Sequence, residues 1–132
     1  MKGIVIVSFL IILCSCATTH RVNGFYEIAD YPDDRIIGKP IVTVADFEKI
    51  TLNTYDSITL IEGRLTHDAT ETFANATEKL TGHRIGFVFC DSVVMAPKIN
   101  CRINGGRFQI ISPDTALIKR IYIHIMLSNV QN

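Results

Sequence analysis

The sequence has no excess of charge of either sign, since 13 Lys and Arg residues balance 13 Asp and Glu residues over 132 positions. It also has no basic stripe, which a nucleic-acid-binding surface needs in order to meet phosphates. The sequence also lacks a Gly-x-Ser-x-Gly elbow, a phosphate-binding loop and two carboxylates at a catalytic spacing. His67 and Asp68 are adjacent, and neighbours in a chain rarely face each other. We therefore expect neither a nucleic acid partner nor enzymatic activity.

Long apolar runs are also missing, apart from one at residues 3–13. This run is too short for a mature membrane-spanning helix, which needs ~20 residues. Lys2 precedes it and a small, polar stretch follows at residues 16–20. A positive start, an apolar middle and a small-residue processing site are typical of a secretory signal. We predict that residues 1–15 form a signal peptide that is removed on export.

The end of the apolar run, Leu13-Cys14-Ser15-Cys16, resembles the bacterial lipobox. That resemblance implies cleavage after Ser15 and acylation of Cys16, with diacylglycerol on the thiol and a further acyl chain, such as palmitate, on the new amino terminus. Several acyl chains anchor a protein firmly, whereas one gives marginal binding. Residue 17 is Ala rather than Asp, so we expect a lipoprotein on the outer membrane that faces the periplasm, with residues 16–23 as its tether.

Cysteine and histidine in the exported part are too few and too scattered for a metal site. The histidines at positions 67, 83 and 124 show no ligand spacing with Cys90 or Cys101, so we expect no metal and no cofactor. In an oxidising compartment these two cysteines fit either of two arrangements. They form a disulfide across neighbouring strands, or they are two buried free thiols.

The remaining 109 residues, 24–132, have the size of one domain with one core. Alternating and β-branched segments predict strands at residues 24–30, 57–65, 85–90, 93–95 and 108–111, with extended chain at 99–103. Capping residues predict a short helix at Val44–Ile50, a helix from Asp68 to Gly82, and a last helix capped by Ser112 with Pro113 at its first position. This order predicts an α+β fold, an antiparallel sheet with helices packed on one face in a split-βαβ-like arrangement.

Several segments in this order resemble one family. They are Gly-Lys-Pro-Ile-Val at 38–42, Phe73-x-x-x-Thr77, the apolar strand that ends in Asp91, Val-x-x-Ala-Pro at 93–97, and the Ile-x-x-x-Ile and Gly-Gly steps at 99–106. The run from Pro40 onward is similar to the head subdomain of the first periplasmic domain (P1) of SecD and SecDF, membrane subunits that assist protein export. The resemblance implies the fold and an ability to hold extended chains. It reaches the head alone, so proton-driven motor activity is not implied.

We expect a non-enzymatic binding module that contacts unfolded or exported polypeptide, or Sec components, with Val93, Met95, Pro97 and Ile99 as the contact region on a strand edge. Pro97 also fits a second role, protection of that edge from aggregation. The alternative function is an accessory or structural envelope lipoprotein that docks one defined protein partner.

Overall fold

The computed structural model describes residues 20–130. The predicted signal peptide and Cys16 lie outside the described residues. These residues form seven strands and two α-helices: β1 (Gly24–Ile28), β2 (Ile36–Thr43), β3 (Phe47–Tyr55), β4 (Ile58–Leu65), α2 (His67–Lys79), β5 (Arg84–Phe89), β6 (Ser92–Met95), β7 (Arg107–Ile111) and α3 (Thr115–Val130), which are the elements of residues 20–130.

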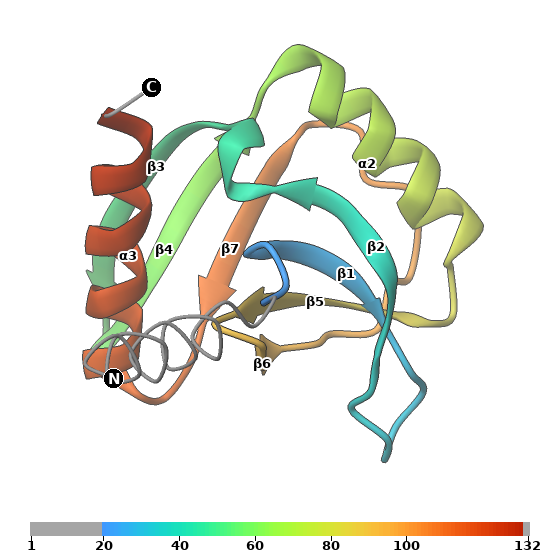
Figure 1. The fold of residues 1–132 in the computed structure, drawn as a ribbon, viewed down its shortest axis with the longest axis horizontal. Coiled ribbons are helices and arrows are strands. Elements are labelled where there is room, and N and C mark those ends of the chain that lie inside the picture. Colours follow the sequence, from blue (N-terminus) through green and yellow to red (C-terminus); the bar gives the residue numbers. More distant parts are fainter. Residues whose placement is uncertain (1–19, 131–132) are drawn as a thin grey trace, which may run out of the picture.

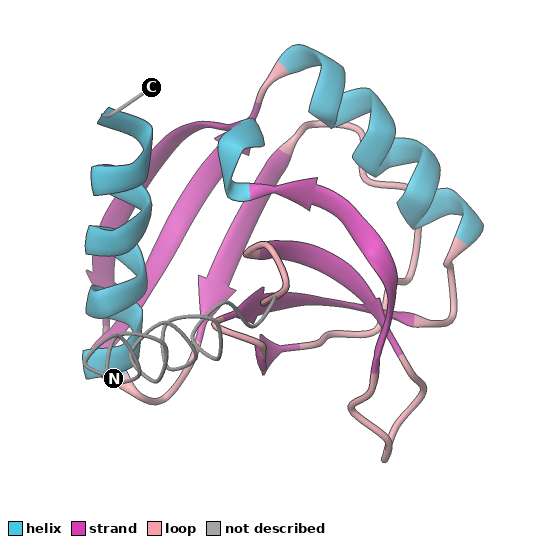
Figure 2. Ribbon diagram, in the orientation of Figure 1, coloured by secondary structure: helices cyan, strands magenta, loops and turns pink. Residues whose placement is uncertain are grey.

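The strands form two antiparallel sheets rather than one (Figure 1). One sheet has the order β2-β1-β5-β6 and the other has the order β3-β4-β7. The predicted α+β class and antiparallel pairing are confirmed. The sequence patterns did not predict β2 and β3 as strands, and each is an outer strand of one of the two sheets. Figure 2 shows them as long strands on either side of a short helical turn.

That short turn corrects the helix predicted at Val44–Ile50. Only Val44–Asp46 is helical, as a single 3-10 turn, and the chain then continues into β3. The Asp46 carboxylate accepts a hydrogen bond from the Thr43 N–H at 2.9 Å, which caps the start of the turn. The β-branched residues that follow, such as Ile50 and Thr51, favour an extended chain.

The first residues of the two helices lie one and two residues away from the predicted ones. Thr66, not Asp68, caps α2, because its hydroxyl oxygen accepts a hydrogen bond from the Ala69 N–H. In α3 the carboxylate of Asp114 accepts from the Leu117 N–H at 3.1 Å, so the predicted cap at Ser112 is wrong. The predicted extended segment at residues 99–103 belongs to no strand.

The larger of two buried apolar clusters lies between the two sheets and the two helices, and phenylalanine rings form its centre. The Phe108 ring lies 4.4 Å from that of Phe47 and 5.4 Å from that of Phe25, centroid to centroid. Phe25 also contacts Phe73 of α2 at 5.7 Å. Tilted and edge-on aromatic pairs of this kind favour a fixed geometry, so they form a firm base for whatever surface lies above them.

Candidate binding groove beside β7

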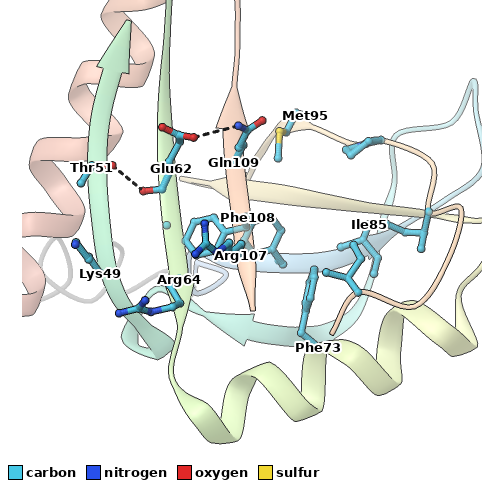
Figure 3. A pocket seen from close by; sticks show the side chains of 15 residues that line it. Lys49, Thr51, Glu62, Arg64, Phe73, Ile85, Met95, Arg107, Phe108 and Gln109 are labelled. Atoms are coloured by element: carbon cyan, nitrogen blue, oxygen red, sulfur yellow. Dashed lines mark hydrogen bonds between the residues drawn. The ribbon is translucent and has the colours of Figure 1, made fainter. Parts of the chain in front are cut away.

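A groove of about 700 Å³ opens where β7 borders the space between the two sheets. Figure 3 shows its lining on both sides of β7: polar side chains over β3 and β4, and apolar ones toward β5 and α2. The apolar lining consists of Phe25, Phe73, Ile85, Met95, Pro97, Ile99, Ile103 and Phe108. The polar lining consists of Lys49, Thr51, Glu62, Arg64, Arg107 and Gln109.

The apolar floor of the groove is part of the core. Phe25, Phe73, Ile85, Ile99 and Phe108 are each less than a tenth exposed. A buried apolar floor with a rim of polar side chains is the usual make-up of a pocket for an organic ligand. A ligand bound here would therefore meet a packed surface.

The edge of β7 that faces the groove forms no backbone ladder with another strand, because β7 pairs only with β4 in the described sheets. The Ile111 N–H donates a hydrogen bond to Met95 Sδ at 3.4 Å and so points away from β4. Backbone groups along a strand alternate in direction, so the N–H and C=O of Gln109 and Arg107 point the same way. Gly106, one residue before Arg107, points the opposite way: its carbonyl accepts a hydrogen bond from the Leu65 N–H of β4 at 2.8 Å. The groove therefore contains unpaired strand donors and acceptors.

Glu62 of β4 is the centre of the polar wall. Its Oε1 accepts hydrogen bonds from Tyr55 Oη at 2.8 Å and Asn53 Nδ2 at 2.6 Å, and its Oε2 accepts one from Gln109 Nε2 at 3.4 Å. The hydrogen bond from Tyr55, followed by that from Asn53, lowers the pKa of the Glu62 carboxyl below its ordinary value. Glu62 is therefore a fixed anion at neutral pH.

The segment between β6 and β7, which forms the far wall, is held to α2 by two side chains. The fully buried Thr77 hydroxyl donates to the Ala74 carbonyl and accepts from the Ile103 N–H at 2.8 Å. Arg102 donates to Asn75 Oδ1 at 3.0 Å and lies 3.3 Å from a carboxylate oxygen of Glu78. These contacts fix the wall to α2.

Three of the four predicted contact residues meet in this groove. Met95, Pro97 and Ile99 line it, whereas Val93 lies outside its lining and packs against a separate cluster around Tyr26. The segment that carries them is also partly paired, because the Pro97 carbonyl accepts from the Ile85 N–H at 3.3 Å. β6 and β7 are each the outermost strand of their sheets, and β7 lines the groove with its edge residues Arg107 and Gln109.

The cysteines differ from both arrangements expected from the sequence. Cys90 and Cys101 are free thiols, and both are exposed. Cys90 lies in the two-residue turn between β5 and β6, where it and Asp91 have positive φ values of 49° and 66°. Neither a bridge between them nor a buried pair is present. Within residues 20–130, no three His, Cys, Asp or Glu side chains are placed to hold a metal ion.

Sequence reasoning missed the polar wall and the role of β7. The alternation of buried Phe108 and Ile110 with exposed Arg107 and Gln109 was a clear strand signal. It did not show that β7 pairs with β4 alone, because the partners of a strand are set by the whole fold.

Two antiparallel sheets and two helices that pack around a shared core make this an α+β domain. Residues 26–117 match the family model described as the SecDF P1 head subdomain. Since the match covers more than half of the chain, the chain belongs to the SecDF P1 head family. This family is a part of a protein-export component and is not an enzyme family.

Solved structures share this fold. One is described as a membrane component SecDF that enhances protein export; it superposes with a TM-score of 0.69 at 18% identity, over 80% of this chain and 62% of that one. Another is SecDF in a super-membrane-facing form, with a TM-score of 0.57 at 24% identity, over 65% of this chain and 12% of that one. The chain thus spans less than two thirds of either. A search of curated proteins found no match. In residues 20–130 no helix is long and apolar enough to cross a membrane.

Proposed function

We propose that this domain is a non-enzymatic binding module that holds an extended polypeptide segment as an added strand on the free edge of β7. The observation that carries the proposal is the unpaired edge at Arg107 and Gln109 beside an apolar groove. Backbone hydrogen bonds supply affinity in strand addition, and pockets for alternate side chains supply selectivity.

The chemistry of the two walls fits an unfolded chain. An added strand presents its side chains alternately to opposite faces, so one set would meet the apolar floor near Phe108 and Ile99 and the other would meet the polar wall near Glu62. Because backbone groups are common to all sequences, the site accepts many segments of mixed polarity. Exported proteins that are still unfolded are ligands of this kind, and family membership favours them or Sec components as partners.

We further propose that acyl chains on Cys16 hold the module on the outer membrane, where it faces the periplasm. The lipobox at residues 13–16 and the Ala at position 17 support this location. Two or more acyl chains supply stable anchoring. The domain would then meet polypeptides after they leave the inner membrane.

The experiment that tests the groove combines a photoreactive amino acid at Met95 with a change at Gln109, in intact cells. Gln109→Pro removes the N–H that points into the groove, and proline is tolerated at an edge position whose N–H makes no ladder bond. Gln109→Ala is the matched control, because it keeps that N–H. One lost backbone hydrogen bond weakens binding about threefold to tenfold.

We expect the Met95 probe to capture many exported proteins, and we expect Gln109→Pro but not Gln109→Ala to reduce that capture. A photoreactive residue at Lys79, on the exposed side of α2, serves as the position control. Equal capture in the proline and alanine variants would rule out strand addition at β7. Capture of a single envelope protein would instead establish docking of one defined partner.

A further inference from the structure

Helix α3 is apolar on its outer side as well as on the side that packs into the core. Its inner face is formed by isoleucines that are fully buried, namely Ile118, Ile121 and Ile125. On the outside, Ile123 is 56% exposed, Leu127 is 61% exposed and Met126 is 39% exposed. A surface helix of a soluble domain normally presents polar residues there. We call Ala116, Ile123, Met126 and Leu127 the outer stripe.

Positive charge borders the outer stripe. Lys119 and Arg120 are exposed beside it, and together with Ala116, Ile123 and Leu127 they line a shallow hollow on this face. Thr115–Val130 contains no Asp or Glu. Neither basic residue belongs to an ion pair among residues 20–130. An apolar stripe with a basic border is the composition of a helix that lies on an anionic membrane surface.

The N-terminal end of the described chain is held close to this helix. The Asp91 carboxylate binds His20 Nδ1 at 2.6 Å and accepts from the Arg21 N–H at 2.8 Å. Two positions before Asp91, the Phe89 ring contacts His124 of α3, with 5.3 Å between ring centroids. The tether therefore enters the domain on the side where α3 lies.

This entry point limits how far the domain can stand from a lipid anchor. Cys16 is four residues before His20, and four extended residues span at most ~14 Å. The part of α3 around His124, beside Phe89, must therefore stay within a short reach of any membrane that holds acyl chains on Cys16.

We infer that the outer stripe of α3 lies in the interface of an anionic membrane, with its apolar side chains at the level of the headgroups and Lys119 and Arg120 against lipid phosphates. This inference rests on the proposed lipid anchor at Cys16. No residue of α3 lines the groove, so the groove stays open to polypeptide in this orientation. The stripe from Ile123 onward also lies beyond the residues that match the family, which end at Leu117.

The chain contains no tryptophan, so a single introduced indole reports on one position. The full-length acylated protein is placed on vesicles of phosphatidylcholine and phosphatidylglycerol whose acyl chains carry bromine, which quenches indole fluorescence at close range. Leu127→Trp is the probe in the outer stripe. Tyr31→Trp is the control, because Tyr31 is 82% exposed in the loop between β1 and β2, which projects away from α3 (Figure 1).

We expect strong quenching for Leu127→Trp and little for Tyr31→Trp. Reversal of both border charges, Lys119→Glu with Arg120→Glu, should lower the Leu127→Trp quenching to about half or less on anionic vesicles while the protein still floats with them.

Similar quenching at both probes, or none at Leu127→Trp in protein that floats, would overturn the inference. A blue-shifted Leu127→Trp emission without quenching would also overturn it and indicate a second copy or another protein on the stripe. Protein that fails to float would overturn the anchor at Cys16 and, with it, this inference.

Discussion

The Phe108 ring lies across Gly63 of the neighbouring strand, so closely that a Cβ at position 63 would come within 2.2 Å of Phe108 Cζ. The ring has little room to move away, because Phe47 and Phe25 pack against it. A glycine here lets an aromatic ring cover the strand and form part of the groove floor. The same contact therefore links the stability of the β3-β4-β7 sheet to the shape of the groove.

Gly63→Ala should destabilise the protein by about 1–3 kcal/mol, since the added methyl group overpacks the Phe108 ring. The urea midpoint, measured by circular dichroism, reports the change. Gly105→Ala is the control, because a Cβ at Gly105 meets nothing within 4 Å. A loss of stability as large in the control would show that the ring contact is not the cause.

Thr77→Val should cost about 1–3 kcal/mol, because the buried Ile103 N–H loses its acceptor while the shape of the side chain is kept. Thr77→Ser keeps the hydroxyl and removes one methyl group, so it should preserve this contact. Hydrogen exchange of residues 97–106 separates the two variants. Faster exchange there in Thr77→Val, but not in Thr77→Ser, is the expected result. Unchanged exchange in the valine variant would contradict the role given to Thr77.

Local patterns predicted the parts of this fold that depend on neighbours in sequence. The strands predicted at residues 85–90 and 108–111 and the helix predicted from Asp68 follow from short-range propensity and period. Pairing between distant segments set the rest. The Thr77 hydroxyl of α2 accepts a hydrogen bond from the Ile103 N–H in the groove wall, far along the chain. The helix signals at residues 44–50 were overridden because most of that segment pairs with β4.

Glu62→Gln should remove part of the pH dependence of stability. The folded-state pKa of Glu62 is lowered, first by the Tyr55 hydrogen bond, so the carboxylate stabilises the fold above its ordinary pKa of 4.5. That contribution is lost as the pH falls through the lowered value. Urea midpoints of wild type and Glu62→Gln should differ at neutral pH and converge once the pH has fallen below the lowered pKa of Glu62. Tyr55→Phe should narrow the same difference, and parallel curves would contradict this account.

Asp91→Gly should release the tether without harm to the fold. Glycine accepts the positive φ of 66° at this position, and the substitution removes the carboxylate that binds His20 Nδ1 and the Arg21 N–H. We expect trypsin to cut after Arg21 faster, by roughly threefold, because an exposed contact of this kind contributes modestly. Release of the domain from vesicles measures the rate in full-length protein. Asp56→Gly is the matched control, since Asp56 occupies the corresponding turn between β3 and β4 with a φ of 48°. If both variants were cut at the wild-type rate, Asp91 would not hold the tether. The direction in which the chain leaves the domain would then be set by other contacts, such as the hydrogen bond that the Asn23 side chain accepts from the Cys90 N–H at 2.9 Å.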